Sequence, residues 1–243
     1  MDEQQLVGQY VAYTYYQVDP AWRRLPVEER VAHKEAWVDV LGEHAARFEW
    51  LESYTVTGVR PDADFFHWKI TERYQDLIEL GAALNATPLA GWLSTPYSYL
   101  ATTKSSQYFE KQSKAKRMGR ITPRGAEYVV VYPFVKLRPW YALPLQERGM
   151  AMREHAEVGS QWVTITNHTT YSFGIDDQEF MTVFECEEPA DFMHLMQRLR
   201  ETEASKYTER DTPIFVGTHC THRTALDLLD GAVTSVRQTA AAE

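Results

Sequence analysis

The stretch Trp22-Arg-Arg-Leu-Pro-Val-Glu-Glu-Arg30 returns later in the chain as Trp140-Tyr-Ala-Leu-Pro-Leu-Gln-Glu-Arg148. Trp, Leu, Pro, Glu and Arg recur at a constant offset of 118 residues, and Tyr10-Val11 meets Tyr128-Val129 at the same offset. Several matches in one register, each beside a similar apolar pattern, indicate two related modules packed as one molecule. The sequence therefore predicts a duplicated fold.

Both copies predict the same order of elements. In the first copy, strands are expected at 7–18, 54–58, 65–70 and 97–102, and helices at 26–48 and 73–83. In the second copy, strands are expected at 128–135, 162–173, 179–185 and 213–216, and helices at 144–158 and 190–207. The order β-α-β-β-α-β is the ferredoxin-like unit. The predicted fold class is α+β, with tandem ferredoxin-like repeats whose two sheets form a barrel-like body covered by helices.

The expected domains are an N-terminal scaffold copy at 1–103, a basic connector at 104–127 and a C-terminal copy at 128–243 that carries the functional site. The connector concentrates positive charge in an otherwise acidic chain, at Lys104, Lys111, Lys114, Lys116, Arg117, Arg120 and Arg124. A solvated linker explains this charge without a ligand. An anionic small molecule bound between the copies would also be attracted by it.

The composition excludes several classes of protein. A net charge of −9 argues against sequence-independent binding to nucleic acid, which needs a dense cationic face. No run reaches the roughly 18 apolar residues of a membrane span, and the first residues are acidic where a signal peptide is basic. Two cysteines, Cys186 and Cys220, are too few for a disulfide framework. We expect a cytoplasmic protein with reduced thiols.

The two copies differ at positions where a chemical site needs titratable groups. His155 stands where the first copy has Trp37, and it falls on a largely apolar stripe of its predicted helix. A packed histidine is the ordinary interpretation of that pattern, but a single imidazole on an apolar helix face is also what a haem iron requires. Glu203, on the following helix, is a candidate acceptor for the second ring nitrogen.

Tyr132 stands where the first copy has Thr14, and it shares a predicted strand with Lys136. Strand alternation places these two side chains on one face. They are either a strand-end tyrosine with a solvated lysine, or a redox-active phenol beside a cation that holds a carboxylate. A further polar group, His219, Cys220 and His222, lacks the spacing of a structural zinc site and is expected to be solvated.

Longer motifs in the chain resemble a known family. They are Arg120-Ile-Thr-Pro-Arg124, Tyr128-Val-Val-Val-Tyr-Pro-Phe-Val-Lys136, Trp140-Tyr-Ala-Leu-Pro144, Glu154-His155, Gly174-Ile-Asp-Asp177, Arg200-Glu-Thr-Glu-Ala-Ser205 and Pro213-Ile-Phe-Val-Gly217. Together they resemble the chlorite dismutase superfamily, and within it the coproheme decarboxylases that complete haem synthesis in many Gram-positive bacteria. The doubled ferredoxin-like fold of that family agrees with the duplication in this sequence.

The resemblance implies roles for individual residues. His155 matches the axial ligand of the haem iron, with Glu203 as the acceptor for its other ring nitrogen. Tyr132 matches the tyrosine that becomes a radical, and Lys136 matches the lysine beside it. Further positions are implied to hold the porphyrin: Arg120, Tyr99, Trp140 and Ser205.

One position departs from the family pattern. Chlorite dismutases carry an arginine above the iron, the Gram-positive decarboxylases typically a glutamine, and this chain has Asn167 there. His168 would take that place only if the strand slipped by one residue, which would turn it to the opposite sheet face. Loss of the cation disfavours chlorite splitting, whereas a side-chain amide can still orient hydrogen peroxide.

The activity implied by the resemblance is oxidative decarboxylation of iron coproporphyrin III (coproheme) to haem b by hydrogen peroxide, with Tyr132, Lys136 and Asn167 as catalytic residues. The implied partners are the porphyrin, peroxide, further copies of the chain in a ring that is usually a pentamer, and the iron-loading enzyme of the same pathway. Two other functions stay open. One is a haem peroxidase or chlorite dismutase-like enzyme, and the other is a non-catalytic haem carrier or regulator.

Overall fold

The computed structural model of the protein describes residues 8–104 and 119–236, so the basic residues 111–117 of the connector lie outside it. The chain forms two compact units. The N-terminal unit contains 9–99 together with the segment that starts at Gly217, and the C-terminal unit contains Leu100–Val216. This division places the segment after Val216 with the first copy, whereas the sequence assigned it to the second. The reason is that β9 pairs with β2 of the first copy through Ser53, Tyr54 and Thr55.

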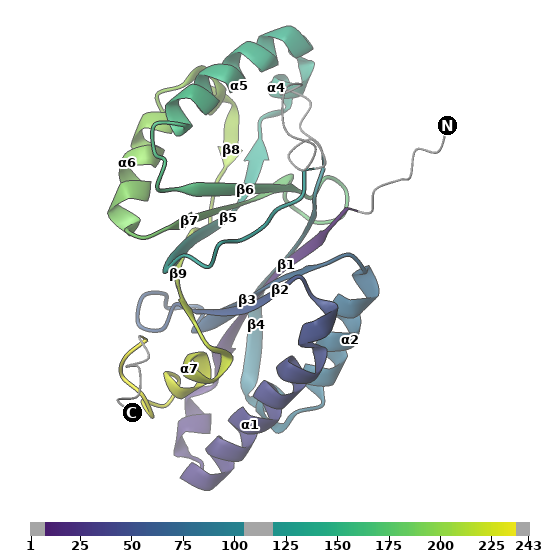
Figure 1. Cartoon of the computed structure of the whole chain (residues 1–243), viewed down its shortest axis with the longest axis vertical. Helices are drawn as coiled ribbons and strands as arrows, with labels where there is room; N and C mark the ends of the chain where they lie inside the picture. Colours follow the sequence, from purple (N-terminus) through teal and green to yellow (C-terminus); the bar gives the residue numbers. More distant parts are fainter. Residues whose placement is uncertain (1–7, 105–118, 237–243) are drawn as a thin grey trace. The chain divides into compact units, whose positions relative to one another are not determined.

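The N-terminal unit has a sheet with strand order β4-β1-β3-β2-β9. Its strands are β1 Tyr10–Val18, β2 Trp50–Thr55, β3 Phe65–Thr71, β4 Leu93–Thr102 and β9 Phe215–Cys220. Its helices are α1 Val27–His44, α2 Tyr74–Asn85 and α7 His222–Asp227, with 3-10 segments η1 Pro20–Arg24, η2 Ala45–Arg47 and η3 Pro88–Trp92. α1 and α2 lie side by side on the sheet (Figure 1). Between helices and sheet lies an apolar core that includes Trp22, Trp37, Leu41, Phe65, Leu80 and Leu84.

The C-terminal unit has a sheet with strand order β6-β7-β5-β8, in which β5–β7 and β6–β7 are antiparallel. Its strands are β5 Tyr128–Lys136, β6 Thr166–Tyr171, β7 Phe180–Cys186 and β8 Thr208–Arg210. Its helices are α4 Arg138–Ala142, α5 Leu145–Gly159 and α6 Pro189–Leu199, followed by the 3-10 turn η4 Glu203–Tyr207. α5 and α6 lie together beside the sheet (Figure 1). The core between α6 and the sheet is formed by Val130, Tyr132, Phe184, Phe192, Leu195 and Leu199.

The predicted duplication and the α+β fold class are confirmed by the positions of these elements. β5 begins and ends 118 residues after β1, and α5 begins 118 residues after α1. In the second half of each copy the offset becomes 115, which relates β7 to β3, α6 to α2 and η4 to η3. Each copy therefore carries the same ferredoxin-like order of strands and helices, with three residues fewer in the second copy.

Two sequence predictions are wrong in detail. The helix expected at 190–207 ends at Leu199, because Thr202 turns the chain by bonding the Leu199 carbonyl through its amide at 3.2 Å and its hydroxyl at 2.7 Å. The group around Cys220 is not solvated. Cys220 is 7% exposed, and the adjacent His219 ring stacks on Trp50 at 6.2 Å between centroids.

A buried carboxylate fastens the segment before β5 to the sheet. The Glu185 side chain is 0% exposed and accepts hydrogen bonds from the amides of Arg124, Gly125 and Ala126 at 2.8–3.1 Å, and His168 Nε2 lies 2.7 Å from it. Burial by itself would raise the pKa of Glu185. The bonds from His168 and from the amides more than offset burial, so this pKa lies below its ordinary value.

We expect Glu185→Gln to lower the free energy of unfolding by about 3 kcal/mol at neutral pH, because one amide oxygen cannot serve all of these buried donors. Since the folded-state pKa is depressed, the contribution of Glu185 is present above the unfolded-state value of about 4.3 and is lost as the pH falls through the lower folded value. Urea unfolding over that pH range measures both effects. The matched control is Glu187→Gln, because Glu187 is exposed and its pairing with Arg124 contributes at most about 1 kcal/mol.

In the described parts of the chain, no helix has the combination of length and hydropathy needed to cross a membrane.

Candidate functional site

The side chain of His155 lies in the C-terminal unit, where α5 meets the turn that follows α6. α5 starts directly after Pro144, with Glu147 in its first turn where the helix dipole favours an acidic group. His155 is half-buried, and its Nδ1 lies 3.0 Å from Thr202 Oγ1. Among the described residues the ring makes no other hydrogen bond, so Nε2 has no partner there.

The imidazole of His155 is neutral at physiological pH. Burial lowers the pKa of His155 to about 4, the positive charge of Lys136 acts in the same direction, and Glu154 opposes it. A metal ion binds the neutral ring through an unprotonated nitrogen. His155 is therefore in the charge state that a metal ligand needs.

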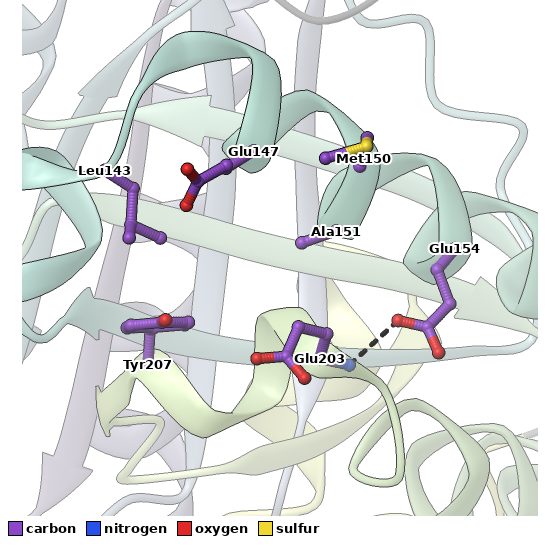
Figure 2. A pocket seen from close by; sticks show the side chains of 7 residues that line it. All are labelled: Leu143, Glu147, Met150, Ala151, Glu154, Glu203 and Tyr207. Carbon is purple, nitrogen blue, oxygen red and sulfur yellow. Dashed lines mark hydrogen bonds between the residues drawn. The ribbon is translucent and has the colours of Figure 1, made fainter.

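A pocket of about 330 Å³ opens between α5 and η4, as Figure 2 shows. Its lining combines three carboxylates with apolar and aromatic groups: Leu143, Glu147, Met150, Ala151, Glu154, Glu203 and Tyr207. Glu154 Oε2 accepts a hydrogen bond from the backbone N–H of Glu203 at 2.9 Å, so the pocket wall also ties α5 to the turn. Three carboxylates repel an anion. This repulsion disfavours binding of a ligand's carboxylate groups in the pocket.

Tyr132 lies on β5 against the helix layer and is 4% exposed. Its ring stacks on Phe184 at 6.2 Å and lies 6.5 Å from Phe192. Burial raises the pKa of Tyr132, the nearby Asp211 raises it further, and Arg200 opposes both. The phenol therefore keeps its proton over the physiological range and can give up a hydrogen atom only by oxidation.

Lys136 is also buried, and it lies at an irregular place in its strand. The register of β5 shifts between Val135 and Lys136, and such a bulge re-aims the side chains beyond it. Lys136 Nζ donates to the carbonyl of Ala204 at 2.6 Å and lies 4.4 Å from the centroid of the Trp140 ring. The ammonium therefore links β5 to the turn at 202–204. The Trp140 ring, which is 2% exposed, packs against the same ammonium.

The charge of Lys136 predicts a pH dependence of stability. Burial lowers the pKa of Lys136 to about 8, with Glu179 opposing. Between that value and the unfolded-state value of about 10.4, the unfolded chain binds more protons than the folded one, so stability rises with pH. Relative to Lys136→Met, the wild type should gain about 2 kcal/mol in unfolding free energy between about pH 7 and about pH 10. Urea unfolding of both proteins at the two pH values measures this, and an unchanged difference contradicts it.

The register of β6 shows which sheet face Asn167 and His168 each occupy. Asn167 pairs with Phe184, and Thr169 pairs with Thr182, which is also the partner of Tyr132. Since directly opposed residues point to the same sheet face, Asn167 shares the face of Tyr132. His168 points to the opposite face, where it bonds Glu185. Asn167 is exposed, and its Oδ1 accepts from the Thr169 hydroxyl at 3.0 Å.

The remaining predicted residues are distributed over several elements. The carboxylate of Glu203 lies 2.6 Å from Lys206 Nζ, and the half-buried Ser205 belongs to the same turn. Arg120 is half-buried in the segment leading to β5. Tyr99 belongs to the N-terminal unit, where its ring stacks on Tyr97 at 6.3 Å.

Sequence reasoning missed two features of the site. One is Thr202, the residue that bonds His155; the signal for it was the recurrence of Leu84 and Thr87 as Leu199 and Thr202 at the second offset of 115. The other is the pair formed by Arg200 and Asp211 at 3.1 Å, whose charges act on Tyr132. That pair joins the end of α6 to the segment after β8, and no local pattern signals it.

The fold and the site define a duplicated ferredoxin-like protein in which His155 on α5 of the second copy stands where the first copy has Trp37 on α1. The family model described as chlorite dismutase matches residues 28–220. The chain belongs to the chlorite dismutase family.

Individual relatives agree with this assignment, and a solved structure shares the fold. A coproheme decarboxylase from Mycolicibacterium smegmatis is 30% identical over 165 residues, which cover 68% of this chain and 70% of that protein. A coproheme decarboxylase from Staphylococcus carnosus is 27% identical over 237 residues, covering 87% and 92%. The solved structure of a mutant chlorite dismutase from Candidatus Nitrospira defluvii shares the fold, with a TM-score of 0.83, 24% identity and coverage of 91% and 95%.

Proposed function

We propose that this protein binds iron coproporphyrin III and converts two of its propionates to vinyl groups with hydrogen peroxide, giving haem b. The observation that carries the proposal is the neutral His155, held at Nδ1 and without a partner at Nε2 among the described residues. The choice of substrate rests on the relatives that are named coproheme decarboxylase.

The donor set fits an iron porphyrin. A porphyrin fills four positions around its iron, so the protein has to supply a single axial nitrogen. Among the described residues, no group of three or more His, Cys, Asp or Glu side chains could hold a metal ion without such a macrocycle. His155 offers the single imidazole nitrogen that a porphyrin iron needs.

The overall reaction balances for each propionate. The side chain loses carbon dioxide and two electrons, and a hydrogen leaves its β carbon as a proton, so a carbon–carbon double bond forms. Peroxide takes up the two electrons together with protons and becomes two molecules of water. When bound, the iron porphyrin supplies the redox chemistry that connects these two half-reactions.

The protein's own residues divide the remaining tasks. Tyr132 is the hydrogen acceptor: its phenol, once oxidised, takes the hydrogen from the propionate β carbon. Asn167, on the same sheet face, offers an amide that orients peroxide, and an amide binds chlorite more weakly than a guanidinium does. Lys136 holds the turn beside His155. Arg120, Ser205 and Trp140 are proposed to place the porphyrin, because small displacements of the reacting carbon are costly.

We further propose that the protein works as a homo-oligomer, as a pentameric ring, in the cytoplasm. Two buried free thiols, Cys186 and Cys220, are consistent with a reducing compartment. The enzyme that loads iron into the porphyrin is the proposed source of the substrate.

The test loads the purified protein with iron coproporphyrin III and titrates it with hydrogen peroxide. Mass spectrometry of the extracted porphyrin should show loss of one carboxyl group after the first equivalent of peroxide. Loss of a second carboxyl group should follow with the second equivalent. The metal-free porphyrin is the control and should keep all of its carboxyl groups. If the iron porphyrin also keeps them, the protein is a carrier, and if chlorite instead releases oxygen, it is a chlorite dismutase-like enzyme.

A further inference from the structure

We propose that Thr202 is the positioning residue of His155. Its hydroxyl fixes the imidazole in the tautomer that carries the proton on Nδ1 and leaves the lone pair on Nε2. This inference deepens the proposed function and rests on it, because it concerns how the ligand of the iron is prepared. It assigns the task to Thr202 rather than to the neighbouring Glu203.

The hydrogen-bond distances determine which group donates. Thr202 Oγ1 lies 2.7 Å from the Leu199 carbonyl and 3.0 Å from His155 Nδ1. The shorter distance is typical of an O–H···O bond and the longer of an N–H···O bond. A hydroxyl has one proton and two lone pairs. Since that proton goes to Leu199, the ring nitrogen has to supply its own, and His155 is protonated at Nδ1.

The first copy contains the same turn without a histidine. Thr87 corresponds to Thr202 at the offset of 115, and its hydroxyl donates to the Leu84 carbonyl, also at 2.7 Å. The backbone angles agree: φ is −79° and ψ 150° at Thr87, and φ is −77° and ψ 155° at Thr202. In that copy Trp37 replaces the histidine, and its indole N–H donates to His67. The hydroxyl therefore bonds the helix carbonyl whether or not an imidazole is present.

Burial strengthens the constraint on the ring. Thr202 is 3% exposed, so water has little access to its oxygen and cannot easily replace His155 as the donor. A buried hydroxyl oxygen facing an unprotonated Nδ1 would bring two acceptors together without a proton, which costs free energy. The other tautomer of His155 is disfavoured for this reason.

Two further bonds keep the turn in place. Glu154, the residue before His155, accepts from the Glu203 amide, and Lys136 donates to the Ala204 carbonyl. Three consecutive residues of the turn are therefore each fixed by a different side chain. This leaves Thr202 little freedom to move away from the ring.

The partner of the ring is a neutral hydroxyl, which has a chemical consequence. A carboxylate at Nδ1 draws the proton away from the ring and makes a metal-bound imidazole more basic. The Glu203 carboxylate is instead paired with Lys206 at the surface. We therefore expect the iron–histidine bond of this protein to be weaker than in the Thr202→Asp variant.

The first experiment needs no cofactor. Histidine labelled with ¹⁵N in the protein without porphyrin reports which ring nitrogen carries the proton, and the His155 signal is assigned by its disappearance in His155→Ala. We expect Nδ1 to be protonated. Protonation of Nε2 in the wild type would overturn the proposal directly.

The second experiment compares three variants. Thr202→Val should shift the ring toward the Nε2-protonated form and weaken the binding of iron coproporphyrin by about 10-fold. Thr202→Ser should restore both. Thr87→Val is the matched control, because it removes the same hydroxyl bond from the same turn in the other copy. It should leave the tautomer and the affinity unchanged, and a loss equal to that of Thr202→Val would show that only the turn's stability matters.

A third measurement tests the neutral partner. In the ferrous protein loaded with porphyrin, resonance Raman should place the iron–histidine stretch at higher frequency in Thr202→Asp than in the wild type.

The first two experiments separate this proposal from the proposed function. If the Nδ1 tautomer is found but His155→Ala binds the porphyrin as the wild type does, the proposed function fails while the bond to Thr202 stands. If His155 binds iron but the ring carries its proton on Nε2 in the free protein, the assignment of Thr202 fails alone.

Discussion

Replacing His155 with alanine should weaken the binding of iron coproporphyrin by about 100-fold or more. Loss of a residue that only orients a metal ligand costs about 10- to 100-fold in affinity, so loss of the ligand itself should cost at least as much. The protein should remain folded, because the half-buried ring makes one hydrogen bond worth about 1 kcal/mol. Titration of the porphyrin into the protein, followed in the Soret band, measures the affinity.

Two further measurements make the His155 experiment specific. Added imidazole should enter the space left by the ring and restore part of the Soret spectrum of the wild type. His194→Ala is the control, since His194 is an exposed histidine on α6 of the same unit and should not affect binding. An unchanged spectrum and affinity in His155→Ala would contradict the assignment of the axial ligand.

Replacing Tyr132 with phenylalanine should abolish vinyl formation while leaving porphyrin binding nearly intact. The ring keeps its packing against Phe184 and Phe192, and only the phenol oxygen, which bonds Thr182, is lost. The cost in stability should be about 1 kcal/mol. The rate of decarboxylation should fall by about 1,000-fold or more, equivalent to roughly 4 kcal/mol in the activation barrier.

Single-turnover reactions with peroxide, stopped and analysed by mass spectrometry, measure the rate in Tyr132→Phe. Tyr128→Phe is the matched control, because Tyr128 lies on the same strand four residues earlier and is half-buried. It should decarboxylate at the rate of the wild type. Full turnover by Tyr132→Phe would exclude Tyr132 as the hydrogen acceptor.

Much of the fold was predictable because the sequence repeats. The matched Trp22 and Trp140 motifs fix where each copy begins its first helix, and β1 and β5 start at the expected offset. Comparison of the copies also singled out His155, because the duplication supplies an internal reference in which Trp37 occupies the same position. Local periodicity and internal comparison are both properties of the chain alone, so no tertiary information was required.

The hydrogen-bond partner of Lys136 was not predictable in this way. Alternation along β5 assumes regular pairing, and the register shift after Val135 depends on β8, a strand more than seventy residues later. Only the folded sheet determines that the ammonium meets the carbonyl of Ala204 rather than the solvent.

The sequence by itself determined the duplication, the α+β class and the histidine that distinguishes the second copy, because each of these is recorded in residue type and spacing. Only the tertiary structure decided what holds that histidine. A helix through 207 is compatible with the local sequence, and its end at Leu199 brings Thr202 rather than Glu203 to the ring. The reason is that a hydrogen bond depends on positions within a few tenths of an ångström, and those positions are set where α5, α6 and the sheet pack together.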